Sequence, residues 1–273
     1  MNVAEAIRAT ARSQPAHPAV VEGERSVSYG ELLARADTLA GEWCRAGVRP
    51  LDRVAFVYPD GIEYVAGSLA LLSLGAAVAP VAPALMWDEI ARLVLELDVR
   101  HVLSAPGARG EAGSDRLPLA DSRQAWRDER YRLATRETRG LGLPGYEAIA
   151  PAFIRFSSGT TGASKGVVLS HRAILERTDA ADRALALTPD DVVLWVLSMS
   201  FHFVVTILLF LRRGATIVLC QSPLPGALVE GVRRHRGTFV YASPFHYHTL
   251  ASSGGLEPSD MTRVRMAVST AMR

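Results

Sequence analysis

The fold of this chain is decided by a strand–helix–strand stretch at residues 53–81, RVAFVYPDGIEYVAGSLALLSLGAAVAPV. Residues 53–58 form a short apolar run, which predicts a strand. Residues 62–74 carry apolar side chains at helical spacing and end at Gly75, and residues 76–81 predict a second strand. Because two strands joined through a helix lie parallel in one sheet, we expect an α/β fold of parallel-rich sheets flanked by helices on both faces.

The pattern continues on both sides of this stretch and then breaks. A helix is predicted at residues 32–43 with a stop at Gly47, another at residues 90–97, and a strand at residues 101–103. Glycines, prolines and a densely charged run interrupt residues 104–150, which predicts an irregular surface connection with room for one solvated helix. We therefore expect a first α/β part at residues 1–103, this connection, and a second part at residues 151–273.

Composition excludes several classes of function. The 273 residues are 49% hydrophobic with a net charge of +2, which predicts a globular protein that binds neither nucleic acid nor an anionic membrane. We expect a cytoplasmic protein without a secretory leader, and we expect Cys44 and Cys220 to be buried thiols. Residues 192–211 carry no formal charge, but their polar interruptions favour a buried strand, a loop and a buried helix over a membrane span.

A glycine-rich segment at residues 157–166, SSGTTGASKG, carries the strongest chemical signal. Apolar runs at residues 152–156 and 167–169 predict a strand on each side, so the segment is a loop between two strands. A Walker loop connects a strand to a helix and places Ser or Thr after its lysine, and this segment does neither. Glycine amides, hydroxyls and a lysine suit a polyphosphate. Lys165 is the only lysine in the chain, since the other 29 of the 30 basic residues are arginines.

The run FSSGTTGASKG at residues 156–166 resembles the phosphate loop of the adenylate-forming superfamily, which includes acyl-CoA synthetases, aryl-CoA ligases and nonribosomal adenylation domains. Three weaker segments agree in order and spacing, at residues 27–32, 72–81 and 197–214. The resemblance spans essentially the whole chain and implies the large N-terminal domain of such an enzyme.

The resemblance implies a two-step reaction. A small carboxylic acid attacks the α-phosphorus of ATP to form an acyl-adenylate, and a thiol of coenzyme A or of carrier-protein phosphopantetheine then takes the acyl group. Mg²⁺ would offset the charge of ATP. Thr160 and Lys165 would take part in the displacement. The residues that match the grip on the β- and γ-phosphates are Ser157, Ser158, Gly159, Thr160, Thr161, Gly162 and Lys165.

Phe201 and His202 fall where the family closes the acyl pocket. Amino-acid-activating members carry Phe-Asp here, the aspartate pairing with the substrate ammonium, whereas this chain has Phe-His. No carboxylate occurs between Asp191 and Glu230. A fatty or aryl acid is therefore favoured over an amino acid. A buried histidine that only satisfies backbone carbonyls is the alternative interpretation of His202.

The sequence departs from the family after residue 268. The family's Tyr-Gly-x-Thr-Glu segment, its ribose-binding aspartate and its C-terminal lid domain with a second lysine have no counterpart in these 273 residues. Three interpretations are open: a truncated or split ligase completed by another polypeptide, a catalytically inactive remnant that binds a nucleotide or a partner, or a fragment. We favour a half-enzyme or a fragment, because the loop is intact.

Overall fold

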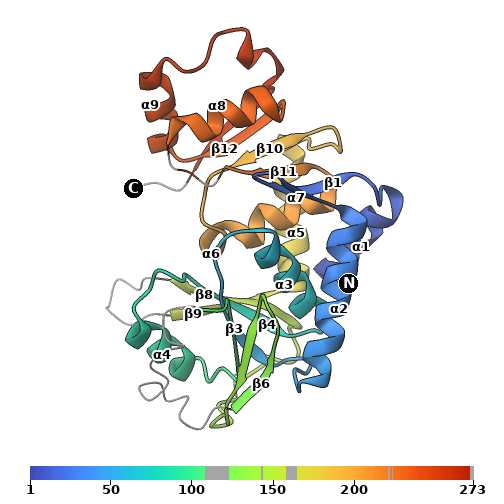
Figure 1. Cartoon of the computed structure of the whole chain (residues 1–273). Helices are drawn as coiled ribbons and strands as arrows, with labels where there is room; N and C mark the ends of the chain where they lie inside the picture. The colour runs from blue at the N-terminus through green and yellow to red at the C-terminus, as the bar shows by residue number, and fades with distance from the viewer. Residues whose placement is uncertain (108–122, 143, 158–164, 221, 223, 271–273) are drawn as a thin grey trace. The chain divides into compact units, whose positions relative to one another are not determined.

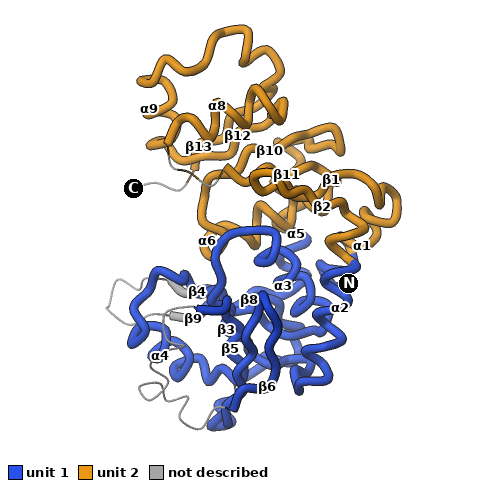
Figure 2. Tube along the Cα trace, viewed as in Figure 1, with its two compact units in different colours: residues 1–5, 34–176 blue, residues 6–33, 177–273 orange. Residues whose placement is uncertain are grey.

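The structure is a computed structural model that describes residues 1–107, 123–142, 144–157, 165–220, 222 and 224–270. These residues form two compact units, and neither is one continuous stretch of chain (Figure 2). Unit 1 comprises residues 1–5 and 34–176, and unit 2 comprises residues 6–33 and 177–273. Each unit contains one mixed sheet, and each is described by itself.

The sheet of unit 1 has the strand order β6-β7-β5-β3-β4-β8-β9. Strands β5, β3, β4 and β8 run parallel, while β7, β6 and β9 are antiparallel to their neighbours. The predicted strand–helix–strand stretch is confirmed as β3, α3 and β4. The strands are β3 (Arg53–Val57), β4 (Ala77–Val81), β5 (His101–Ser104), β6 (Arg123–Arg127), β7 (Arg132–Thr135), β8 (Pro151–Ser157) and β9 (Lys165–Ser170).

Helices cover both faces of this sheet, as predicted. Helix α4 (Trp87–Glu96) places Ile90 and Val94 against Ala55 and Val57 of β3. The opposite face is covered by α3 (Ile62–Ser73) and α2 (Tyr29–Arg45). There Gly67 of α3 lies so close to the ring of Phe56 that a Cβ would stand 2.8 Å from it. Alternate residues of β3 therefore point to helices on opposite sides, which makes the strand a continuous buried run.

Residues 104–150 contain more regular structure than an irregular connection. The charged run at residues 123–135 forms a hairpin, β6–β7, instead of a solvated helix, and β7 extends the sheet through β5. Tyr131, Leu133 and Tyr146 of this stretch are buried. The strand was missed because its arginines make the segment look like a charged surface region. In the strand, Leu133 is buried in the core while the neighbouring Arg132 donates hydrogen bonds to backbone carbonyls.

The sheet of unit 2 has the order β13-β12-β10-β11-β1-β2 and is parallel except for the β1–β2 hairpin. Figure 1 shows the N-terminal strand β1 beside β11, where Val20 pairs with Ile217. The strands are β1 (Pro18–Glu22), β2 (Arg25–Ser28), β10 (Val192–Trp195), β11 (Thr216–Leu219), β12 (Phe239–Ala242) and β13 (Met266–Ser269).

This sheet is also covered on both faces. Leu194, Val218 and Val240 pack against α8 (Pro225–Arg234), with α9 (Pro244–Ser253) beside it. On the other face, Phe210 of α7 (Ile207–Arg213) contacts Trp195, Phe239 and Tyr241. The remaining helices are α1 (Val3–Ser13), α5 (His171–Leu185), α6 (Met199–His202), and the 3₁₀ turns η2 (Phe203–Val205) and η3 (Asp260–Arg263).

Two sequence predictions about apolar segments have different outcomes. Residues 192–211 form a strand and a buried helix as predicted, but the predicted loop between them contains the short helix α6 and the turn η2. No helix in the described ranges is long and apolar enough to cross a membrane. The prediction that both cysteines are buried is wrong for Cys44, which is exposed. The helical spacing that points Trp43 into the core turns the next residue of α2 toward solvent. Cys220 is buried, and burial raises the pKa of its thiol to about 12.

Candidate functional site

The glycine-rich segment joins two strands of unit 1, as the sequence predicted, and the structure shows that they are antiparallel. Strand β8 ends at Ser157 and β9 begins at Lys165, and these two residues pair directly across the hairpin. Ser158, Gly159, Thr160, Thr161 and Gly162 lie outside the described residues, and Ser157 and Lys165 are described by their backbone alone. The hairpin therefore brings the first and last residues of the predicted phosphate grip together.

The position of β8 in the sheet determines where the loop begins. Strand β8 pairs in parallel with β4, with Phe153 opposite Val78, and residues Ala152, Phe153 and Ile154 are buried. The loop thus leaves the carboxyl end of a buried parallel strand. In open α/β sheets, ligands bind outside this end of the strands.

Gly166 shows why a glycine follows the lysine. A Cβ at this position would lie 3.1 Å from Cδ2 of Leu97 and 3.5 Å from Cγ2 of Ile154. Side chains rarely tolerate the first of these distances, so Leu97 would have to shift to admit even an alanine. Gly166 therefore allows the start of β9 to pack closely against β8 and the end of α4.

A capped helix follows the second strand of the hairpin. Helix α5 begins at His171, and Ser170 caps it by accepting a hydrogen bond from the backbone N–H of Ala173 at 3.1 Å. His171 is buried, and its Nδ1 accepts a hydrogen bond from the backbone N–H of Val3.

The candidate acyl-pocket residues belong to unit 2 and lie on α6, directly after β10. Phe201 exposes 57% of its surface, whereas His202 is half-buried. The ring of His202 meets Trp195 edge-on at 6.2 Å between centroids. Helix α6 therefore carries an exposed aromatic ring next to a half-buried imidazole.

Two residues near this position were missed by sequence reasoning. Trp195 and Ser200 are buried, and within the described part of the chain neither Nε1 of Trp195 nor Oγ of Ser200 has a hydrogen-bond partner. Since buried polar groups are nearly always satisfied, both atoms need an explanation. The available signal was an aromatic residue at the carboxyl end of a predicted parallel strand, but only the structure shows that Trp195 contacts His202.

The carboxylate nearest to this segment in sequence, Asp191, is already fully engaged. Its side chain accepts hydrogen bonds from Arg265, Thr188 and Thr238. Burial by itself raises the pKa of Asp191, but these hydrogen bonds outweigh burial and hold the pKa below its ordinary value. Asp191 is therefore a structural counter-ion of Arg265 and leaves no spare charge for a substrate ammonium.

The glycine amides, the hydroxyls and the lysine of residues 157–166 suit a polyphosphate better than a metal ion held by protein ligands. Among the described residues, no group of three or more His, Cys, Asp or Glu side chains could hold a metal ion. His246 and His248 lie on α9, and Nδ1 of His246 is 2.6 Å from Oγ of Ser243. By contrast, the paired backbones of Ser157 and Lys165 bracket a loop of small and hydroxylated residues.

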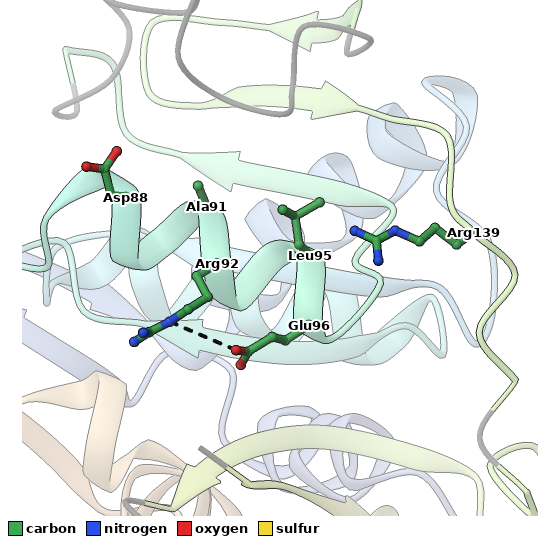
Figure 3. A pocket seen from close by; sticks show the side chains of 6 residues that line it. All are labelled: Asp88, Ala91, Arg92, Leu95, Glu96 and Arg139. Carbon is green, nitrogen blue, oxygen red and sulfur yellow. Dashed lines mark ion pairs between the residues drawn. The ribbon is translucent and has the colours of Figure 1, made fainter. Parts of the chain in front are cut away.

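A separate hollow of about 420 Å³ lies beside α4 in unit 1 (Figure 3). Of the four charged side chains drawn in Figure 3, Arg92 and Glu96 face each other, with Nε of Arg92 3.9 Å from Oε1 of Glu96. None of the candidate site residues that the structure describes lines it. Its lining residues are Asp88, Ala91, Arg92, Leu95, Glu96 and Arg139.

Comparison with known proteins identifies the family. The profile of the AMP-binding enzyme family matches residues 7–273. This chain belongs to the AMP-binding enzyme family. The resemblance inferred from the phosphate loop is thereby confirmed, together with the fold class of the N-terminal domain of adenylate-forming enzymes.

Relatives within the AMP-binding family include both CoA ligases and carrier-protein ligases. The chain is 30% identical over 264 residues to a 3-hydroxybenzoate–CoA ligase of Aromatoleum sp., with 87% of this chain and 47% of the relative covered. It is 29% identical over 284 residues to an L-proline–[L-prolyl-carrier protein] ligase of Streptomyces coelicolor, with 94% and 52% covered. The chain thus spans about half the length of these two relatives.

A solved structure confirms the fold along the entire chain. Apo MatB from Rhodopseudomonas palustris superposes with a TM-score of 0.80 at 22% identity, covering 100% of this chain and 56% of MatB. Because the two curated relatives act on different classes of acid, membership of the AMP-binding family does not by itself decide the substrate.

Proposed function

We propose that this chain provides the phosphate-binding part of an enzyme that uses ATP to activate a fatty or aryl carboxylic acid, first as an acyl-adenylate and then as a thioester. The observation that carries the proposal is the hairpin β8–β9. It presents a glycine- and hydroxyl-rich loop, with the only lysine of the chain, at the carboxyl end of a buried parallel strand.

In the proposed first step, a carboxylate oxygen of the acid forms a bond to the α-phosphorus of ATP. The bond from the α-phosphorus to the bridging oxygen breaks, and pyrophosphate leaves with the electron pair. The residues assigned to grip the β- and γ-phosphates are Ser157, Ser158, Gly159, Thr160, Thr161, Gly162 and Lys165. Their amides and hydroxyls, with the ammonium of Lys165, would stabilise the negative charge that develops on the leaving pyrophosphate.

In the proposed second step, the thiolate of coenzyme A or of carrier-protein phosphopantetheine attacks the acyl carbon, and AMP leaves. Mg²⁺, when bound with ATP, supplies positive charge that offsets repulsion between the triphosphate and the incoming carboxylate. Any step that requires a second lysine needs a residue from outside these 273, since Lys165 is the only lysine. We therefore propose that another polypeptide segment completes the activity.

Three observations favour a fatty or aryl acid over an amino acid. Residues 192–229 contain no carboxylate, and Asp191, which precedes them, is bonded to Arg265. Phe201 presents an exposed aromatic ring on α6. An α-ammonium bound beside these residues would lack a counter-charge, which is costly in a desolvated pocket.

The test combines ATP binding with carboxylate-dependent ATP–pyrophosphate exchange, using octanoate, benzoate, 3-hydroxybenzoate and L-proline. We expect ATP to bind in the presence of Mg²⁺. We expect exchange with the fatty or aryl acids above that with proline, either from the chain alone or after a complementing segment is added. Exchange that is fastest with proline would contradict the assigned acid class.

A folded chain that binds no ATP would contradict the proposal and favour an inactive remnant that interacts with a partner. The readout for folding is cooperative unfolding in urea, which keeps a misfolded sample from being counted as this outcome.

A further inference from the structure

Unit 1 has another hollow, of about 370 Å³, at the end of β8 that lies farthest from the glycine-rich loop. Pro151 begins β8 and lines the hollow, whereas Ser157 ends the strand at the loop. A strand of this length spans about 20 Å, so the hollow is separate from the candidate phosphate site. Its volume lies at the small end of the range of about 300–1,000 Å³ for small-molecule sites.

One wall of the hollow carries a buried histidine. His171 lines the hollow and is only 7% exposed. Its Nδ1 accepts a hydrogen bond from the backbone N–H of Val3 at 3.3 Å, so the neutral ring carries its proton on Nε2. The hydrogen bond described for His171 uses Nδ1, which leaves the Nε2–H available to a ligand in the hollow. Burial, with a smaller contribution from the positive amino terminus, lowers the pKa of His171 to about 4, which keeps the ring neutral at pH 7.

The charges around His171 favour an anion. The neighbouring Arg172 lines the hollow and makes a long, exposed ion pair of 4.0 Å with Glu176. Both residues begin helix α5, whose first turn contains no acidic residue. The positive end of the helix dipole adds to this preference. Among the described residues that line the hollow, none carries a carboxylate.

The remaining walls are mostly apolar, with Pro50, Leu51, Ile149 and Pro151 facing the hollow. A bare inorganic anion would leave these walls without a partner, whereas an amphipathic acid would cover them. We propose that this hollow is a second ligand site, which binds a small carboxylate with an apolar tail. The carboxylate accepts a hydrogen bond from Nε2 of His171 and pairs with Arg172, while the tail contacts Leu51 and Ile149.

The test is a titration of the full 273-residue chain, labelled with ¹⁵N at its histidines, followed by NMR. His171→Phe and His202→Phe spectra assign the two ring signals that matter. We expect octanoate to shift the ¹⁵N signal of Nε2 of His171 until the site is saturated. Acetate, which lacks the apolar tail, and 1-hexanol, which lacks the carboxylate, should each bind at least tenfold more weakly. Inorganic phosphate binding as tightly as octanoate would overturn the assignment of an apolar carboxylate.

Variants of residues inside and outside the hollow test whether octanoate binds there. Arg172→Gln should weaken octanoate binding about fivefold, the modest effect of an exposed charge. Arg177→Gln, an exposed arginine of the same helix that does not line the hollow, should leave it unchanged. Ile149→Trp should fill the hollow and abolish the shift of His171, with cooperative urea unfolding as the check on folding.

Two further outcomes would overturn the proposal. One is an octanoate titration that shifts His202 and leaves His171 unchanged, because binding would then be confined to the candidate acyl site. The other is equal weakening by Arg172→Gln and Arg177→Gln, because the effect would then come from net charge alone.

Discussion

At the scale of single residues, Lys165 and Gly166 show how one short sequence meets two demands. Gly166 meets a packing demand, because a Cβ there would stand 3.1 Å from Cδ2 of Leu97 and would require that side chain to shift. Lys165 meets a chemical demand, and it is the only lysine among 30 basic residues. An ammonium on a flexible stem can follow a phosphate group that moves, which a planar guanidinium does less well.

Lys165→Ala should weaken ATP binding by about 10-fold to 100-fold, the loss expected for a charge-assisted hydrogen bond. The urea midpoint should stay unchanged, because the role assigned to Lys165 is to bind phosphate and not to pack in the core. Arg92→Gln, on the exposed face of α4, is the matched control for loss of one positive charge. Calorimetric titration with ATP and Mg²⁺ measures the effect, and equal affinities for the parent and the Lys165 variant would refute the phosphate-grip assignment.

The pair of Asp191 and Arg265 is the second residue-scale feature with a measurable consequence. Asp191 is 2% exposed, and Arg265 reaches it from a position 74 residues away while also donating to the carbonyls of Leu185 and Ala186. The guanidinium also lies over the ring of Phe239, 5.6 Å from its centroid. This pair therefore joins β10, β12, the end of α5 and the start of β13.

Arg265→Met should destabilise the chain at pH 7 by about 2–3 kcal/mol, less than for a fully buried pair because Arg265 is partly exposed. The folded-state pKa of Asp191 lies below the ordinary value of 3.8, so its contribution to stability is complete above that pH and is lost as the pH falls through the folded-state pKa. Urea unfolding at pH 7 and at pH 2.5 should show that the difference in free energy of unfolding between the parent and the Arg265→Met variant is smaller at the lower pH. A gap that widens would contradict this assignment.

At the scale of elements, helix α3 is buried along nearly all of its length. Ten of its residues, from Ile62 to Leu72, are buried, and Gly67 faces Phe56, Trp43 and Tyr131. A helix that is apolar all round has to be enclosed by other elements, and α3 is therefore a central packing element of unit 1.

Gly67→Val should destabilise unit 1 by about 2–3 kcal/mol, because a Cβ would already stand 2.8 Å from Phe56 and the methyl groups would add to the overlap. The matched control is Gly41→Ala on the exposed face of α2, where the nearest atom to a Cβ is the guanidinium of Arg45 at 4.0 Å. That substitution should stabilise the helix by about 0.5–1 kcal/mol. Urea unfolding should therefore show a lower free energy of unfolding for Gly67→Val and a higher one for Gly41→Ala. Changes of the same sign in the two variants would contradict the packing assigned to α3.

At the scale of the whole molecule, the two units are not consecutive along the chain. Unit 2 needs residues 6–33 because β1 pairs with β11, and Tyr29 at the start of α2 donates a hydrogen bond to the carbonyl of Ala215 at 2.8 Å. In unit 1, Tyr131 donates in the same way to the carbonyl of Glu63 at 2.7 Å. The two tyrosines are thus equivalent buried donors, one in each unit.

Tyr29→Phe and Tyr131→Phe should each cost about 1–2 kcal/mol, because each leaves a buried carbonyl with a hydrogen bond fewer. Each unit has its own sheet and core, so each variant should weaken mainly its own unit. We expect Tyr29→Phe to reduce the protection of amides from exchange in the sheet of unit 2, and Tyr131→Phe to reduce it in the sheet of unit 1. Hydrogen-exchange mass spectrometry distinguishes this result from an equal loss of protection in both sheets, which would show that the chain opens as one cooperative body.

The sequence by itself determined the features that depend on neighbouring residues. The alternation at residues 53–81 predicted β3, α3 and β4, and the apolar runs beside the glycine-rich segment predicted the strands β8 and β9. The resemblance of the glycine-rich segment to a known phosphate loop indicated the family. Its glycines and hydroxyls reflect a local need for backbone freedom and hydrogen-bond donors. Such signals are readable because side-chain periodicity and glycine content act within a few residues.

Only the tertiary structure decided the features that join distant residues. The pairing of β1 with β11, the contact of Arg265 with Asp191 and the hairpin β6–β7 added to the sheet are examples. Likewise, the exposure of Cys44 and the hollow beside His171 depend on what packs around each residue. These contacts are set by how the sheets and helices close over each other, and the free energy of that closure depends on the shape and burial of the whole assembly rather than on any short stretch of sequence.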